Sequence, residues 1–197
     1  MLQFLGALAA AVPALLMAHK LWRVWGDPQA GDHPDWVRSG IAIFIMEFIV
    51  IHSGVFFATT FGPRAETPVT VMLGLCAFYL LFAAVIGFAF KVPGLTSSFI
   101  MLMIGRAVFA SLFMTAHDFK LLKAHSVTGF ILYMFCIFLG LMVLPKRGMK
   151  TEIVRPMVVG CGTGAWIEQL HTAIGAAAVY FALLGLAELA VFTWIKI

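Results

Sequence analysis

Charged residues are scarce in this chain. Asp, Glu, Lys and Arg together make up 11% of its 197 residues, whereas a soluble domain carries about 25%. A water-facing globule, a disordered chain and a charged coiled coil all need more polar surface than this. The shortage therefore excludes a soluble enzyme and favours a membrane protein.

Cysteine is scarce as well. The chain has three cysteines, Cys76, Cys136 and Cys161, and no two of them form a CxxC pair. An odd number at such spacings does not provide a disulfide framework, which excludes a small secreted domain held by disulfides. The formal net charge of +4 is spread over separate loops. We therefore expect no nucleic-acid partner, since such a partner requires a clustered basic face.

Apolar sequence is what the chain has in abundance. Hydrophobic residues make up 62% of it, and the mean hydropathy is +1.03. A helix that crosses a membrane needs about 20 mainly apolar residues. Six stretches meet this requirement, near residues 2–22, 40–61, 69–90, 95–115, 126–144 and 172–194. The sequence therefore predicts an all-α, polytopic integral membrane protein. We expect a bundle of six transmembrane helices that forms one transmembrane domain over residues 1–197.

The connections between these stretches differ in length and charge. Residues Arg23 to Arg38 read as an irregular loop rich in Asp, Gly and Pro, residues 117–125 as a short basic link, and residues 145–171 as the longest connection. The first, third and fifth loops carry eight Lys and Arg residues, against four in the second and fourth loops and the C-terminus. Positive loops tend to stay in the cytoplasm. We therefore expect a multi-pass protein of the cell membrane with both termini on the non-cytoplasmic side.

One helix carries a regular series of small residues. Gly175, Ala178, Ala182 and Gly185 lie three, four and three positions apart in the last apolar stretch. Small residues at this spacing allow two helix backbones to approach closely inside a bilayer. The pattern predicts a helix–helix contact rather than a chemical site.

Two ionisable residues lie deep in apolar stretches. Placing such a group in the hydrocarbon costs about 2.5 kcal/mol or more, so Glu47 and Arg106 require an explanation. Their predicted depths from the same side of the membrane are similar, and their charges are opposite. The pair either lines a cleft that holds a ligand, ion or proton, or locks two helices together as a structural salt bridge. His52 follows Glu47 on the same stretch, but about 140° around the helix.

The sequence predicts a ligand-binding site formed by Glu47, His52 and Arg106, which binds or passes a small ligand or a proton. We assign no catalytic residue, and the absence of a soluble catalytic domain favours a protein that is not an enzyme. One alternative is an accessory or assembly subunit of a membrane complex. A second is a haem or quinone redox protein, with His19 and His171 in one layer and His117 and His125 in another.

Metal-binding patterns are weak in this chain. Glu168 and His171 form a single Glu-x-x-His step, whereas a di-iron bundle needs two such steps and further glutamates. We therefore assign no metal and no cofactor. Glu188, near the end of the last stretch, is expected to extend towards the membrane–water interface. The expected surroundings are a lipid bilayer, with a membrane-protein partner or a second copy of the chain left open.

Overall fold

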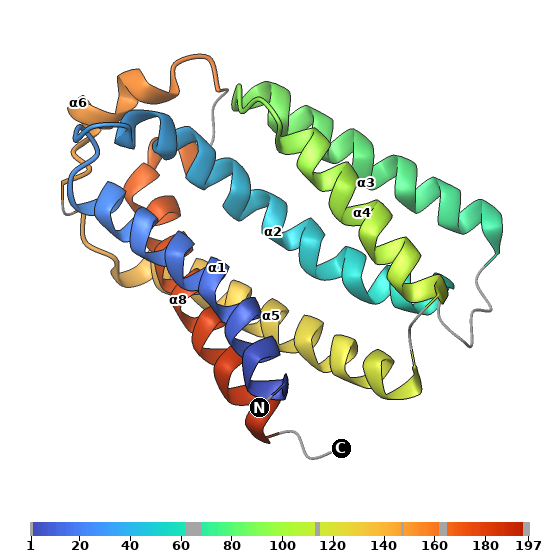
Figure 1. The fold of residues 1–197 in the computed structure, drawn as a ribbon. Coiled ribbons are helices and arrows are strands. Elements are labelled where there is room, and N and C mark those ends of the chain that lie inside the picture. The colour runs from blue at the N-terminus through green and yellow to red at the C-terminus, as the bar shows by residue number, and fades with distance from the viewer. Residues whose placement is uncertain (1, 62–67, 113–114, 147, 162–164, 195–197) are drawn as a thin grey trace. The chain divides into compact units, whose positions relative to one another are not determined.

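A computed structural model describes residues 2–61, 68–112, 115–146, 148–161 and 165–194 (Figure 1). All the regular secondary structure in these residues is helical. Each of the six apolar stretches corresponds to one long helix. These helices are α1 (Leu2–Gly26), α2 (His33–Phe61), α3 (Val69–Ala89), α4 (Leu95–Leu112), α5 (Ala116–Val143) and α8 (Leu170–Trp194).

Over the residues that the structure describes, three of these helices are long and apolar enough to cross a membrane. They are α2 over His33–Gly54, α5 over Ala116–Met142 and α8 over Leu170–Ala190. Helices α3 and α4 contain shorter apolar stretches, Leu73–Ala89 and Leu95–Val108. The structure supports an all-helical membrane protein, while the number of spans and their orientation stay predictions.

The chain forms two compact units. The terminal unit consists of Met1–Phe44 and Ile131–Ile197, and the central unit consists of Ile45–Phe130. Helices α2 and α5 each contribute residues to both units.

Helices α1 and α8 lie side by side in the terminal unit (Figure 1). A Cβ atom added to Gly185 would lie 2.7 Å from the side chain of Leu15, and one added to Gly175 would lie 3.0 Å from the ring of Trp25. The residue numbers rise along α8 while they fall along α1, so the two helices are antiparallel. The predicted small-residue contact is confirmed, and its partner is α1.

Helix α2 joins this contact at Gly40. A Cβ atom at that position would lie 2.5 Å from the side chain of Leu21 on α1 and 2.9 Å from that of Ile174 on α8. Both Leu21 and Ile174 are completely buried. The missing side chain of Gly40 therefore allows three helices to converge in the terminal unit.

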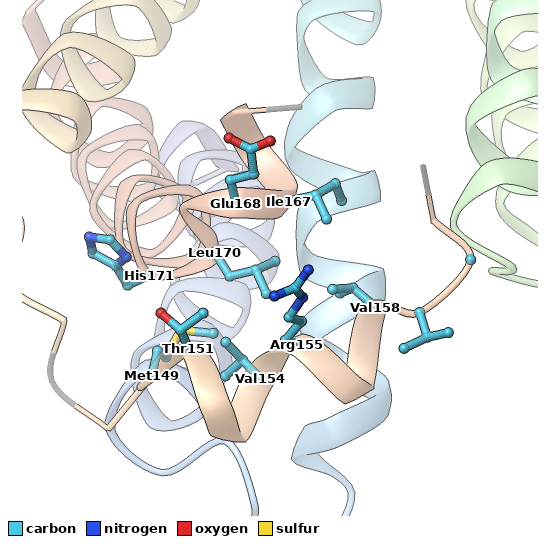
Figure 2. Close-up of a pocket in the computed structure, with 11 residues that line it drawn as sticks. Met149, Thr151, Val154, Arg155, Val158, Ile167, Glu168, Leu170 and His171 are labelled. Atoms are coloured by element: carbon cyan, nitrogen blue, oxygen red, sulfur yellow. The ribbon is translucent and has the colours of Figure 1, made fainter. Parts of the chain in front are cut away.

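The long connection between α5 and α8 contains short helical turns (Figure 2). These are α6 (Thr151–Val154), the 3-10 turn η1 (Arg155–Val158) and α7 (Ala165–Glu168). Arg38 of α2 donates a hydrogen bond from Nε to the carbonyl of Met157. Gly148 passes so close to the carbonyl of Gly26 that no side chain would fit there. The connection is thus held against α1 and α2.

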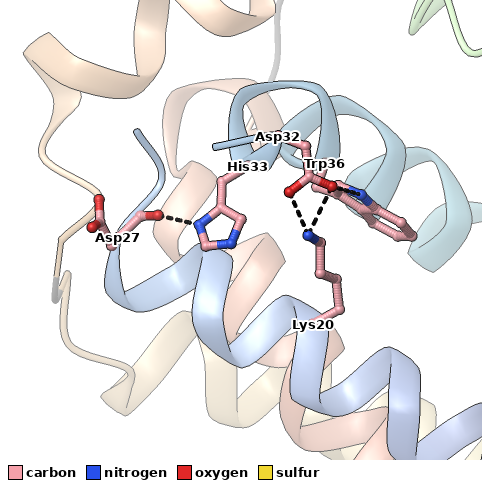
Figure 3. A network of polar contacts seen from close by, with 5 residues as sticks. All are labelled: Lys20, Asp27, Asp32, His33 and Trp36. Atoms are coloured by element: carbon pink, nitrogen blue, oxygen red, sulfur yellow. Dashed lines mark hydrogen bonds and ion pairs between the residues drawn. The ribbon is translucent and has the colours of Figure 1, made fainter. Parts of the chain in front are cut away.

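The loop between α1 and α2 is shorter than the sequence predicted. Helix α1 continues to Gly26 and α2 begins at His33, so the expectation of an irregular loop from Arg23 to Arg38 is wrong at both ends. Pro34 in the first turn has the φ angle of a helix, and the carboxylate of Asp35 is favourable near a helix N-terminus. The ring of buried His33 hydrogen-bonds the carbonyl of Asp27 at 2.5 Å, which ties the new helix start to the end of α1 (Figure 3).

The predicted basic link over residues 117–125 is also helical, because α5 begins at Ala116. A reciprocal pair of hydrogen bonds caps this helix. The Thr115 hydroxyl oxygen accepts a hydrogen bond from the Asp118 backbone N–H at 3.2 Å, and the Asp118 carboxylate accepts one from the Thr115 backbone N–H at 2.8 Å. This arrangement is a capping box with Asp in place of the usual Glu. The predicted span over residues 95–115 includes Thr115, so the sequence pattern does not separate this cap from the preceding helix.

The central unit has an apolar core shared by α2, α3 and α4. Its buried members are Met46, Ile49, Tyr79, Ala83, Phe99 and Met103. Large apolar side chains are also exposed on α3 and α4, including Leu73 at 59%, Phe88 at 88% and Met101 at 69%. Such extensive apolar exposure is expected where helices face lipid rather than water.

Candidate functional site

Arg106 of α4 is bound to the backbone and a side chain of α2. Its guanidinium donates hydrogen bonds to the carbonyl of Val50 and, at 2.5 Å, to the Oγ of Ser53. Ser53 is completely buried, and its hydroxyl donates to the Val50 carbonyl at 3.0 Å. Hydrogen bonds from a charged donor are stronger than neutral ones. They connect α2 and α4 at this level of the central unit.

Glu47 acts on the same guanidinium through its charge. The two residues interact electrostatically, as their opposite signs and similar depths led us to expect. The hydrogen bonds of Arg106, however, go to Val50 and Ser53, which lie up to two turns further along α2. A hydroxyl and a carbonyl therefore join the carboxylate in stabilising the buried cation.

Gly54 provides the space in which α2, α4 and α5 meet. A Cβ atom on Gly54 would lie 3.5 Å from Oγ of Ser126 and 3.7 Å from Cζ of Arg106. These separations are ordinary van der Waals contacts. Because Gly54 has no side chain, polar groups of α4 and α5 come close to α2.

A cavity of about 380 Å³ lies beside this polar contact in the central unit. Ligand pockets have volumes of about 300–1,000 Å³ and combine apolar walls with a few polar groups. This cavity has that character, because three of its residues carry polar side-chain groups and the others are apolar. Its lining consists of Ile51, His52, Phe56, Tyr79, Ser126, Val127 and Phe130.

His52 is the residue of the cavity with the most versatile chemistry. Its Nδ1 lies 2.7 Å from the carbonyl oxygen of Phe48. A carbonyl only accepts hydrogen bonds, so Nδ1 carries the proton, and in the neutral ring Nε2 is left as an acceptor. The centroid of the imidazole ring lies 4.3 Å from that of the Phe48 ring and 5.5 Å from that of the Phe130 ring, which it meets edge-on. Two aromatic neighbours therefore hold the imidazole in place.

The structure separates the three predicted site residues into two groups. His52 lines the cavity, whereas Glu47 and Arg106 are not among the described residues that line it. Instead, Arg106 binds Ser53, the residue that follows His52 on α2. Sequence reasoning missed the two hydroxyl groups of the cavity, Tyr79 and Ser126. Hydroxyl side chains are common in apolar helices. Only the direction of the side chain in the fold therefore identifies these two as cavity residues.

The other predicted polar residues lie elsewhere. Within the described residues, no group of three or more His, Cys, Asp or Glu side chains could hold a metal ion, and the haem or quinone hypothesis stays a prediction. Glu168 and His171 line a second cavity, in the terminal unit. Glu188 is only 7% exposed, so the expectation that its side chain extends into the interface is wrong.

Comparisons with protein families, with curated proteins and with solved structures find no match for this chain.

Proposed function

We propose that the chain is a multi-pass membrane protein that binds a small, mainly apolar ligand in the cavity of the central unit. The observation that carries this proposal is the cavity of about 380 Å³ with His52 in its wall. The ring geometry leaves Nε2 of neutral His52 as a hydrogen-bond acceptor.

The lining suggests the class of ligand. Phe56, Tyr79 and Phe130 supply aromatic surface, which favours contact with a planar or ring-shaped molecule. His52 can accept a hydrogen bond from a ligand hydroxyl, and the hydroxyl of Ser126 can donate one or accept one. The best fit is therefore a small aromatic or alicyclic molecule with one or two polar groups.

Glu47 and Arg106 have a supporting role in this proposal. The bonds of Arg106 to α2 end on Ser53, next to His52 in sequence. They set the position of α4 relative to the part of α2 that lines the cavity. We therefore treat Arg106 and Glu47 as positioning residues, with His52 in direct contact with the ligand.

Binding of 1-naphthol to the detergent-purified chain tests the proposal, with naphthol fluorescence as the readout. His52→Leu removes the acceptor, and we expect affinity to fall about tenfold, which corresponds to the loss of one hydrogen bond worth about 1.4 kcal/mol. Ser126→Ala should cause a smaller loss. His117→Leu is the matched control, because His117 is exposed and outside the cavity. Equal affinity for His52→Leu and His117→Leu would overturn the proposal.

The position of His52 between the Phe48 carbonyl and the cavity favours a second candidate function, proton passage. Imidazole can take up a proton on one nitrogen and release one from the other. Proteoliposomes with an internal pH-sensitive dye would report proton entry under an imposed pH gradient. A flux that is lost in His52→Leu supports proton passage. A flux that is absent or independent of His52 leaves ligand binding as the function.

We further propose that six helices cross the cell membrane, with both termini on the non-cytoplasmic side. The six apolar stretches and the eight-to-four distribution of Lys and Arg support this topology. Alkaline phosphatase fused after residue 197 should be active, and a fusion in the loop after residue 91 should be inactive. The reverse pattern would refute the orientation, and activity in both would refute the number of spans between them.

A further inference from the structure

The terminal unit contains a second cavity, of about 430 Å³. Its walls come from the α6, η1 and α7 connection and from the start of α8 (Figure 2). Its accessible apolar part consists of Val159, which is 68% exposed, and the partly buried Ile167, whereas Val154, Val158 and Leu170 are each only 3% exposed. Its polar part consists of Thr151, Arg155, Glu168 and His171. The cavity thus combines an accessible apolar surface with charged groups of both signs.

The backbone of this cavity is firmly held. Arg38 binds the carbonyl of Met157, within the η1 turn. Gly148 lies against the carbonyl of Gly26, just before the first lining residue, Met149. Met149 itself is 1% exposed. These contacts attach the wall to α1 and α2, so the cavity is a formed site rather than a gap between loops.

The two charged residues of the cavity have no partner within the described part of the chain. Arg155 and Glu168 form no ion pair or hydrogen bond there with one another or with other side chains. Figure 2 shows the guanidinium of Arg155 rising from η1 towards the stretch that carries Ile167 and Glu168. Both side chains are exposed and line the cavity, so a ligand at its mouth that carries both charges can reach each of them.

The cavity also lies where lipid head groups are expected. Leu170, one of its lining residues, is the first residue of the candidate span in α8. The end of a spanning helix lies at the boundary between hydrocarbon and head groups. A ligand at this level can place its polar end among charges and its apolar end along the exposed apolar side chains of the lining.

We propose that this cavity binds the phosphoethanolamine group, whose anionic phosphate would bind Arg155 and whose primary ammonium would bind Glu168. Guanidinium recognises phosphate through two parallel hydrogen bonds. A carboxylate accepts hydrogen bonds from a primary ammonium, which a quaternary ammonium cannot donate. The glycerol and first chain carbons of a lipid would then lie on Val159 and Ile167, the accessible apolar residues of the lining. The site is in the terminal unit and does not depend on the function proposed for the central unit.

Native mass spectrometry of the detergent-purified chain tests this assignment. The probes are dioctanoyl phosphatidylethanolamine, phosphatidylcholine and phosphatidylglycerol, which differ only in the head group. We expect the ethanolamine lipid to bind about tenfold more tightly than the other two. Equal binding of all three lipids would overturn the proposal.

Two variants separate the two charge contacts. Arg155→Gln should weaken binding of both the ethanolamine and the glycerol lipid, because both carry phosphate. Glu168→Gln should weaken only the ethanolamine lipid, because the glycerol lipid has no ammonium. The matched controls are Lys150→Gln and Glu152→Gln, which alter exposed charges beside the cavity but outside its lining. Losses in the controls equal to those in the variants would show a general charge effect and refute the site.

The source of the phosphoethanolamine group is decided by competition. If free phosphoethanolamine displaces the lipid at a similar concentration, the site serves a soluble metabolite. If it does not, while the lipid binds with the expected selectivity, the site serves a membrane lipid. Arg155→Lys keeps the charge but loses the paired geometry, so intermediate affinity is expected. Circular dichroism of each variant ensures that a loss of binding is compared between folded proteins.

Discussion

Gly175 and Gly185 in the terminal unit and Gly54 in the central unit serve opposite purposes. In the terminal unit, Gly175 and Gly185 bring α8 against α1 so closely that an added Cβ would press on the neighbouring side chains. In the central unit, a Cβ on Gly54 would meet its neighbours at 3.5 Å or more. Two of those neighbours are the polar ends of Arg106 and Ser126. The first two glycines remove space between helices, whereas Gly54 leaves room for polar groups beside a cavity.

This difference shows how one apolar composition produces both a close helix contact and a candidate binding site. Inside a bilayer, helices associate mainly through close packing and hydrogen bonds rather than through the hydrophobic effect. The terminal unit relies on close packing, with Ala173, Ala176 and Ala177 completely buried. The central unit relies on larger side chains and on the hydrogen bonds of Arg106.

The largest expected loss of stability comes from substituting Gly148, the glycine of the terminal unit whose added Cβ would lie closest to a neighbouring atom. Gly148→Ala would place a methyl group on the carbonyl of Gly26, and backbone cannot move aside as a side chain can. We expect a loss of about 3 kcal/mol in the free energy of unfolding, at the upper end for overpacking. SDS titration followed by circular dichroism measures it. Gly105→Ala is the control, because nothing lies within 4 Å of its added Cβ, and equal stability of the two variants would contradict the prediction.

A smaller loss is expected from the polar contact of the central unit. Arg106→Gln removes the charged donor from Ser53 and from the Val50 carbonyl, so we expect about 2 kcal/mol of destabilisation. Ser53→Ala leaves the carbonyl bond and should cost about half as much.

Combining Arg106→Gln with Glu47→Gln shows how far the two charges depend on each other. Recovery of stability in the double variant would indicate a structural ion pair, as would strong losses in both single variants. Stable single variants with altered 1-naphthol binding would instead place these residues in ligand contact, which contradicts their positioning role. The same unfolding and fluorescence measurements distinguish the two results.

The direct comparison of the two units is between two Gly→Ala substitutions. Gly185→Ala must displace the side chain of Leu15 and approach the Ala11 carbonyl to 3.3 Å, for which we expect a cost of about 1 kcal/mol. Gly54→Ala meets only ordinary contacts and should leave stability nearly unchanged. The SDS unfolding titration should rank them in this order. If Gly54→Ala costs as much as Gly185→Ala, the proposed contrast between the units is wrong.

The smallest effect concerns the loop between α1 and α2. The Lys20 ammonium hydrogen-bonds both carboxylate oxygens of Asp32, at 2.6 and 2.9 Å, and lowers the pKa of Asp32 below its ordinary value of 3.8 (Figure 3). The unfolded chain therefore takes up this proton at a higher pH than the folded chain. The stabilisation is complete above pH 3.8 and is lost as the pH falls through the lower folded pKa.

Asp32→Asn should remove this part of the acid-induced loss of stability. The change should be small, because the Asp32 side chain is 63% exposed and surface ion pairs contribute little. Unfolding midpoints measured from pH 5 down to about pH 2 would reveal it. Asp35→Asn is the comparison variant: Asp35 is exposed and forms no ion pair within the described residues, so this change removes only the favourable charge at the start of α2. If the stability of Asp32→Asn falls with decreasing pH as much as that of the unchanged protein, the prediction is wrong.

Sequence reasoning reached the helical segments and part of the candidate site. Long apolar runs with polar breaks are a strong local signal, and each predicted stretch corresponds to a helix. Glu47 and Arg106 stood out because charge in an apolar run is rare. The start of α5 was missed because Thr115 and Asp118 were assigned to different segments, although together they form the cap.

The sequence by itself determined the helical membrane class, the small-residue contact face of α8 and the unusual polarity of the segment around Glu47 and His52. These properties depend on local composition and on helical periodicity. Only the tertiary structure decided that Arg106 binds Ser53, that Tyr79 and Ser126 share a cavity with His52, and that Arg155 and Glu168 share another. The physical reason is that a cavity or a hydrogen bond between helices depends on the rotation and depth of each helix. Packing between helices that are distant in sequence sets both.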